Sequence, residues 1–187
     1  MKNVTIYLES NPNPKTLKFV ANVMLMEEGV SVDFASPTEA QASALAQELF
    51  MYPFVERVFF SANFVTITRN NEVSWHEIQD PLKNHIKKFL ETGRALTESP
   101  HAKPDETKEE SETVKKIKGI LEQYIRPAVE QDGGAITFHS YKEKTVWVQL
   151  QGSCSGCPSA ATTLKIGIEN LFRKLMPEEV EHVLDVQ

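Results

Sequence analysis

Residues 146–175 read VWVQLQGSCSGCPSAATTLKIGIENLFRKL, and they pass from a β-strand pattern to a helix pattern through a short loop. Val146, Val148 and Leu150 recur at every second position, which predicts a strand with one buried face. Beyond the loop, apolar residues follow the spacing of one helix face until Pro177 ends the helix. These helix positions are Ala161, Leu164, Ile168, Leu171, Phe172 and Leu175. The stretch therefore predicts a strand, a cysteine-containing loop and a helix.

The residues on either side of this stretch complete a small α+β domain. A helix with the same apolar spacing precedes it and ends at Asp132-Gly-Gly134. Its apolar positions are Val114, Ile117, Leu121, Tyr124, Ile125 and Ala128. Ile136 and Phe138 then begin a strand that pairs with the strand at 146–150 across a turn at 141–144. Residues 180–186 add a last strand, so we expect the order helix, hairpin, loop, helix, strand.

The first half of the chain predicts a second α+β domain, a small sheet covered by two helices. Strands are expected at 4–8, at 17–20 and in a hairpin of 55–60 with 64–68. A capping box at Ser36 predicts a helix over 37–50, and a second capping box at Ser74 begins a helix that Gly93 ends. Asp80 before Pro81 is an alternative start for that helix.

Residues 95–112, ALTESPHAKPDETKEESE, separate the two halves. They contain two prolines, almost no apolar side chains and many acidic ones, so they cannot bury enough apolar surface to offset the entropy lost on ordering. We therefore expect two α+β domains, 1–94 and 113–187, joined by a flexible acidic linker over 95–112.

Composition and charge exclude several classes of protein. The chain has 187 residues, 26 acidic and 20 basic side chains and a net charge of -6, which argues against a general nucleic-acid binder. Lys115, Lys116 and Lys118 fall on the polar face of a helix and indicate a solvated surface. Residues 1–10 show no signal-peptide or transit-peptide pattern, and no window holds the ~18 apolar residues of a membrane span. We expect a cytoplasmic protein that binds neither membrane nor nucleic acid.

Cys154 and Cys157 are the two cysteines of the chain, so a disulfide-stapled framework is excluded. Pro158 suits the first turn of the following helix, whose N-terminal amides and partial positive charge stabilise thiolates by about 0.3 to 1 kcal/mol. Gly152 and Gly156 allow the backbone to approach a bound group closely. The loop is suited to holding a group on two thiolates.

Four interpretations of this cysteine pair remain open on the residues alone. A thioredoxin-like dithiol fits the strand-to-helix position, but that fold needs more chain after the motif than is present. A zinc site needs two further ligands, for which His139 and His182 are the nearby candidates. An inert buried pair conflicts with the Gly, Ser and Pro neighbours, which indicate a surface loop. The fourth is an iron-sulfur cluster, which takes thiolate ligands.

A family resemblance favours the fourth interpretation. Glu130–Gly134, Val148–Ser159 and Thr163–Glu169, in that order, resemble the C-terminal domain of NifU-like (Nfu-type) iron-sulfur cluster carriers over the whole second domain. Asn11–Phe19 and Val58–Thr68 are similar to the N-terminal domain that accompanies this module in many members. Ser61 departs from the glycine expected in the hairpin turn.

The resemblance implies a carrier of a labile 4Fe-4S cluster and no enzymatic activity. Such a cluster takes four thiolates and the chain has two, so the simplest arrangement is a homodimer in which Cys154 and Cys157 of both protomers bind one cluster. The expected partners are an upstream scaffold and apo iron-sulfur acceptor proteins. The alternative functions are a CxxC dithiol-disulfide oxidoreductase and a zinc-binding adaptor.

Overall fold

The structure is a computed structural model of the whole chain, and it describes residues 3–27, 29–97, 111–155 and 158–186, of which 158–161 are described by backbone alone. The chain divides into two compact units, Met1–Lys103 and Pro104–Gln187, each with its own sheet and helices. Most of the expected linker over 95–112 lies outside the described residues. No helix among the described residues is long and apolar enough to cross a bilayer.

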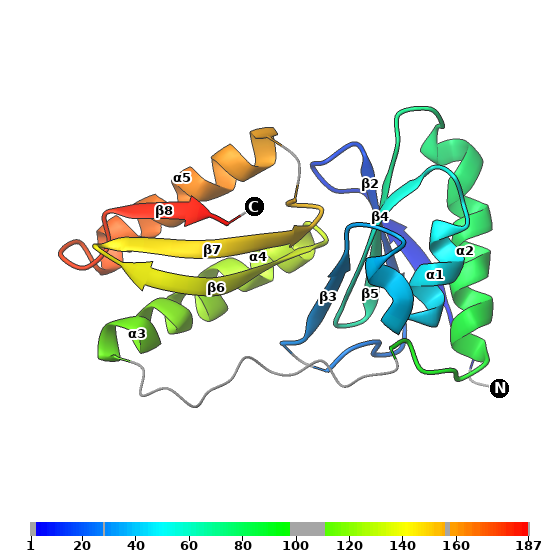
Figure 1. Ribbon diagram of the computed structural model, residues 1–187, viewed down its shortest axis with the longest axis horizontal. Coiled ribbons are helices and arrows are strands. Elements are labelled where there is room, and N and C mark those ends of the chain that lie inside the picture. The colour runs from blue at the N-terminus through cyan, green and yellow to red at the C-terminus, as the bar shows by residue number, and fades with distance from the viewer. Residues whose placement is uncertain (1–2, 28, 98–110, 156–157, 187) are drawn as a thin grey trace. The chain divides into compact units, whose positions relative to one another are not determined.

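A five-stranded antiparallel sheet forms the N-terminal unit, with the strand order β1-β2-β5-β4-β3 (Figure 1). The strands are β1 Ile6–Glu9, β2 Thr16–Ala21, β3 Ser31–Phe34, β4 Val55–Ser61 and β5 Phe64–Arg69. Four of them confirm the sequence pattern, and β3 was not expected. In the β4–β5 turn it is Ala62 that has a positive φ, of 42°, while Ser61 belongs to the strand and pairs with Phe64. Serine at position 61 is therefore compatible with the turn.

The helix expected over 37–50 is interrupted. A 3-10 turn, η1, covers Glu39–Ala42, and α1 covers Ala44–Phe50. Between them Ser43 is extended, with φ -134° and ψ 110°, and its hydroxyl oxygen accepts a hydrogen bond from the Ala46 amide. The same hydroxyl donates to the Leu96 carbonyl at 2.6 Å. Ser43 is therefore the N-cap of α1, whereas the sequence pattern had predicted that the helix begins after Ser36.

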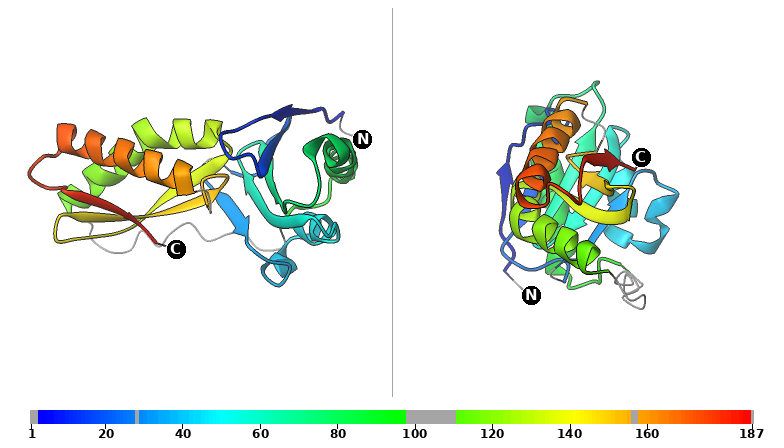
Figure 2. Two further views of the ribbon diagram at one scale, coloured as in Figure 1. Left: turned by 90° about the horizontal axis from the view of Figure 1, so that it is seen from above. Right: turned by 90° about the vertical axis from the view of Figure 1, so that its left-hand side faces the viewer.

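The second helix, α2 Trp75–Glu91, follows the sequence pattern closely. Ser74 and Glu77 form the expected capping box, and Pro81 lies inside the helix, so the alternative start at Asp80 is wrong. Gly93, with a φ of 72°, follows the helix end. The inward residues of α1 and α2 share one apolar cluster with the sheet, and both helices lie on the same side of it (Figures 1 and 2).

In the C-terminal unit, one expected helix is three segments: α3 Glu112–Ile120, a π-helical turn η2 Leu121–Ile125, and α4 Arg126–Gln131. The Arg126 amide donates to the carbonyl of Leu121, five residues earlier, which is the hydrogen-bond pattern of a π-helix. This wider turn stands directly before Pro127, which has no amide hydrogen to continue the regular ladder.

The π-turn changes which residues face the core. The buried positions are Ile117, Leu121, Ile125 and Val129, spaced by four. In a regular α-helix every fourth residue drifts by about 40° around the axis, and a wider turn offsets this drift. Tyr124 and Ala128, which the 3.6-residue period places inward, are exposed instead.

A three-stranded sheet, in the order β6-β7-β8, completes the C-terminal unit. The strands are β6 Gly134–Lys142, β7 Thr145–Gly152 and β8 His182–Asp185. The first two form the expected hairpin, and β8 runs parallel to β7. The last helix, α5 Pro158–Leu175, begins at the predicted proline. Figure 2 shows that α5 and the α3–α4 helix cover the same face of this sheet.

Candidate metal centre

The loop that contains Cys154 joins the end of the central strand β7 to α5. Gly152, with a φ of 64°, is the last residue of β7 and turns the chain out of the sheet. Cys154 follows two residues later, and α5 begins at Pro158. The loop therefore has the strand-to-helix position that the sequence predicted. Gly156 and Cys157, the other predicted site residues, lie outside the described residues.

The turn at Asp132–Gly134, which leads into the neighbouring strand β6, is hydrogen-bonded to this loop. The Ser153 amide donates to the Gly133 carbonyl at 3.2 Å, and the Ser153 hydroxyl donates to the Asp132 carbonyl. Gly133 has a φ of 78°, a conformation that favours glycine. Two hydrogen bonds therefore fix the residue directly before Cys154 to the turn that begins β6.

Gly134 leaves the space that the Cys154 side chain occupies. A Cβ atom at this position would lie 2.6 Å from the Gln151 carbonyl oxygen and 2.9 Å from Cys154 Sγ. Gly134 also pairs with Gly152 across the two strands. The sequence predicted the Asp-Gly-Gly turn as a helix stop, and its contact with Cys154 was not anticipated. Two consecutive glycines, where one suffices to end a helix, are the signal that could have indicated it.

Cys154 belongs to the apolar cluster of its unit and is buried, whereas its Gly and Ser neighbours had indicated a surface position. The turn at 132–134 lies against it, which explains part of this enclosure. Its Sγ lies 3.9 Å from the Ser153 hydroxyl oxygen. Because that hydroxyl gives its proton to the Asp132 carbonyl, the thiol is the donor in this contact.

The histidines weighed as zinc ligands lie far from Cys154. His182 pairs with Thr145, seven residues from Gly152 along β7, which corresponds to about 23 Å. His139 lies on β6 opposite Trp147 and Val148, about 13 to 16 Å from the Gly152 end. Zinc–nitrogen bonds are about 2.0 Å long, so neither imidazole can share an ion with Cys154 in this arrangement. Within the described ranges, no three His, Cys, Asp or Glu side chains form a group able to hold a metal ion.

Comparison with known proteins matches both units. The family model described as "Scaffold protein Nfu/NifU N terminal" matches residues 6–93, and the one described as "NifU-like domain" matches residues 117–183. Among solved structures, the NMR structure of a NifU-like protein from Saccharomyces cerevisiae is 27% identical, with a TM-score of 0.48, and the match covers 52% of this chain and 87% of that one.

Curated relatives align with nearly the whole chain. A protein of Drosophila ananassae named "NFU1 iron-sulfur cluster scaffold homolog, mitochondrial" is 38% identical over 188 residues, which cover 98% of this chain and 66% of the relative. The protein of the same name from Drosophila persimilis is 37% identical, with 98% and 67% covered. The chain thus spans about two thirds of the length of these relatives.

These relatives overturn the expected cytoplasmic localisation, because their names place them in mitochondria. The expectation rested on the composition of residues 1–10. Targeting segments are separate from the folded domains and are removed after import, so the residues of a folded domain carry no such address.

The two family models match in chain order, each within one of the two units. The curated relatives align across both units and are identical to this chain at more than a third of the aligned positions. The chain therefore belongs to the Nfu/NifU family of scaffold proteins.

Proposed function

We propose that this protein receives an iron-sulfur cluster as cargo and passes it to apo-acceptor proteins. The relatives named as iron-sulfur cluster scaffolds support a role in cluster assembly. The finer proposal is a 4Fe-4S cluster bound by Cys154 and Cys157 of two protomers, one cluster per dimer. The protein then acts as a carrier and makes no covalent bond within a small substrate.

The observation that carries this proposal is the contact between the turn at 132–134 and the cysteine loop. Gly134 leaves room for Cys154 Sγ, and the two hydrogen bonds of Ser153 fix the backbone beside it. A ligand loop held in this way presents its thiolate at a defined place, which favours cluster binding over a freely moving pair of thiols.

The number of ligands supports a shared cluster. A 4Fe-4S cluster takes four cysteine thiolates, and the chain contains two cysteines. Two protomers related by a two-fold axis supply the full set. His139 and His182 lie too far from Cys154 to complete the set within one chain.

The residues of the loop have separate roles in this proposal. Each thiol loses its proton when iron binds, and the N-terminus of α5 beside the loop stabilises the negative charge. Ser153 holds the loop against the turn throughout. Transfer proceeds by ligand exchange, in which an acceptor thiolate forms a bond to iron as a Cys154 or Cys157 thiolate leaves. No electron transfer is needed.

Anaerobic reconstitution with iron and sulfide tests this function. We expect brown protein with four iron and four acid-labile sulfide per two chains, and a mass that corresponds to a dimer. Cys154→Ala and Cys157→Ala should each remove the cluster, whereas Gly119→Ala, at an exposed helix position with open space around it, should retain it. One zinc per chain without labile sulfide, or a colourless monomer that reduces disulfides, would refute the proposal in favour of the adaptor or the oxidoreductase.

A further inference from the structure

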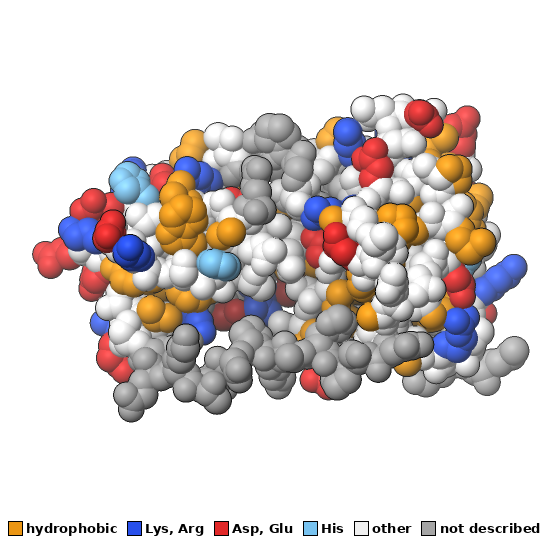
Figure 3. Space-filling view, viewed as in Figure 1, with side chains coloured by type: hydrophobic (Ala, Val, Ile, Leu, Met, Phe, Trp, Pro, Cys, Tyr) orange, Lys and Arg blue, Asp and Glu red, His pale blue; other side chains and the backbone are white. Residues whose placement is uncertain are grey.

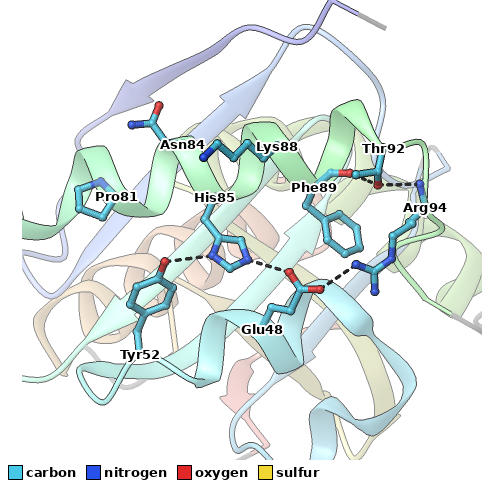
Figure 4. A pocket seen from close by; sticks show the side chains of 9 residues that line it. All are labelled: Glu48, Tyr52, Pro81, Asn84, His85, Lys88, Phe89, Thr92 and Arg94. Carbon is cyan, nitrogen blue, oxygen red and sulfur yellow. Dashed lines mark hydrogen bonds and ion pairs between the residues drawn. The ribbon is translucent and has the colours of Figure 1, made fainter. Parts of the chain in front are cut away.

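The N-terminal unit has a groove of its own, whereas the cysteine loop belongs to the C-terminal unit. The groove runs between the C-terminal end of α1 and one face of α2, and its volume is about 470 Å³ (Figure 4). Volumes of this size are typical of binding sites. The side chains that line it are Glu48, Tyr52, Pro81, Asn84, His85, Lys88, Phe89, Thr92 and Arg94.

One wall of the groove is a chain of hydrogen bonds across the two helices. His85 Nδ1 lies 3.0 Å from the Tyr52 hydroxyl, and His85 Nε2 lies 2.8 Å from Glu48 Oε2. Arg94 donates to Glu48 Oε1 at 2.8 Å, and its guanidinium lies 4.6 Å from the centre of the Phe89 ring. Both oxygens of Glu48 are therefore engaged, and its negative charge is offset by Arg94.

This arrangement does not suit a metal ion. Tyr52 and Glu48 contact opposite nitrogens of the His85 ring, so one ion cannot contact all three side chains in this geometry. The Arg94 guanidinium beside the carboxylate also repels a cation. The side chains of this wall therefore bond mainly to one another, and a ligand would bind to other groups that line the groove.

The hydrogen-bonding capacity that remains toward the groove consists mainly of donors. Asn84 and Lys88 are exposed, lie one turn apart on α2, and have no hydrogen-bond or ion-pair partner among the described residues (Figure 4). Arg94 uses one of its nitrogens on Glu48 and retains further N–H groups. A ligand that satisfies these donors must carry acceptors, and carboxylates are the acceptors that pair best with ammonium and guanidinium groups.

The net charge of the surface around the groove is positive, like the charge of Lys88 and Arg94. The charged side chains that line the groove are Glu48, Lys88 and Arg94, and residues 83–94 contain four basic side chains and one acidic one, in a chain whose net charge is -6. The acidic one, Glu91, lies 3.8 Å from Lys87. In the space-filling view, basic side chains gather over the C-terminal half of α2, at the right-hand edge (Figure 3). The surface is thus complementary to an acidic partner.

Glu48 also lines a second hollow, of about 480 Å³, together with the apolar side chains of Pro37, Phe50 and Met51 and two glutamine side chains. Met51 is 82% exposed, the largest exposed fraction among the large apolar side chains of the described residues. An isolated small anion makes no use of this apolar surface, whereas a peptide with acidic and apolar residues matches both parts.

We propose that this groove is a docking site for an acidic peptide segment of a partner protein, with carboxylates at Asn84, Lys88 and Arg94 and an apolar side chain over Met51. Every residue named belongs to the N-terminal unit, whereas Cys154 belongs to the C-terminal unit.

Isotope-edited NMR and fluorescence anisotropy on the full chain test the proposal. The probe is a fluorescein-labelled peptide of alternating glutamate and leucine, and its control has glutamine in place of glutamate. At millimolar peptide we expect shifts at the Asn84 side-chain amide and at Arg94. We expect affinity at least about tenfold weaker for the glutamine peptide and for Lys88→Glu, with Lys88→Gln between. The matched control Lys116→Glu, an exposed lysine of the other unit, should change affinity by less than about twofold.

Three outcomes would overturn the docking site. One is the absence of shifts at Asn84 and Arg94 at millimolar acidic peptide. Another is equal weakening by Lys88→Glu and Lys116→Glu, which would show that only net charge matters. The third is tighter binding of single-stranded oligothymidine at the same residues, which would assign the surface to nucleic acid. Lys88 is exposed and has no ion-pair partner among the described residues, so its variants should fold, and an unchanged melting temperature verifies this.

Discussion

Replacing Gly134 with alanine should both destabilise the C-terminal unit and impair cluster loading. The added Cβ would lie 2.6 Å from the Gln151 carbonyl oxygen, where ordinary contacts begin at 3.4 Å, so about 0.8 Å of movement is required. The Gln151 carbonyl belongs to the strand paired with β6 and cannot move alone. Cys154 Sγ, at 2.9 Å, must also shift, by about 0.5 Å.

The expected magnitude follows from these overlaps. An added methyl group in a packed site costs about 1 to 3 kcal/mol, which in a unit of this size lowers the melting temperature by roughly 4 °C or more. Metal sites tolerate displacements of about 0.2 Å in their ligand distances, so a shift of Sγ by about 0.5 Å exceeds the tolerance. We therefore expect lower iron and sulfide content in Gly134→Ala even at temperatures where the variant is fully folded.

Thermal unfolding by circular dichroism and anaerobic reconstitution measure the two effects. Gly119→Ala is the matched control, because nothing lies within 4 Å of its added Cβ and alanine favours a helix by about 0.5 to 1 kcal/mol. It should melt at the same or a higher temperature and load normally. If Gly134→Ala melts like the wild type and binds a full cluster, the steric argument for this glycine is refuted.

Two further predictions concern single hydrogen-bonded groups. Ser153→Ala removes the hydroxyl that donates to the Asp132 carbonyl, worth about 1 kcal/mol, so a loaded protein should lose its cluster to a chelator several-fold faster, and an unchanged rate of visible bleaching would contradict this. Glu48 has a pKa lowered from 4.5, mainly by the hydrogen bond from His85, with burial acting against the shift and Arg94 adding to it. Its carboxylate therefore stabilises the fold above pH 4.5, and this stabilisation is lost as the pH falls through the folded-state pKa. Urea unfolding should show wild type more stable than Glu48→Gln at pH 7, with the difference shrinking below pH 4.5; a difference independent of pH would rule out this linkage.

The sequence predicted the elements of both units well where a local signal exists. The capping box at Ser74, the glycine after α2 and the proline at the start of α5 each act through their own backbone, so their effect needs no knowledge of distant residues. The strand β3 was missed although Val32 and Phe34 alternate with polar residues, because four residues are too few for a pattern to stand out.

Other features depend on tertiary contacts and could not be predicted from spacing alone. Ser43 interrupts the helix expected over 37–50 because it bonds Leu96, fifty-three residues away. The π-turn in the α3–α4 helix places Tyr124 on the exposed face. The buried residues of this helix are spaced by four, and this spacing differs from the 3.6-residue period that predicted Tyr124 to be buried.

The sequence suggested a metal-binding role for His139, whereas the structure places this residue at a bulge in β6. At this bulge, Phe138 pairs with Val148 and Ser140 with Trp147. The extra residue lets both Phe138 and Tyr141, three positions apart, pack against the apolar cluster, which a regular two-residue period does not allow. The apolar spacing of two and then three along β6 is the sequence signal for this bulge.

The register of the β6–β7 hairpin explains why a CxxC pair alone is weak evidence and the three motifs together are strong. The hairpin begins and ends with Gly134 opposite Gly152, so the turn before β6 and the loop after β7 leave the sheet side by side. Ser153 can then reach Asp132 and Gly133, and Cys154 can occupy the space that Gly134 leaves. A one-residue slip would put Ala135 or Gly133 opposite Gly152 and move the loop off this turn. The cysteine site is therefore specified by the length of the hairpin as much as by the cysteines, and a CxxC sequence without a double glycine at the matching distance lacks the wall that positions its first thiol.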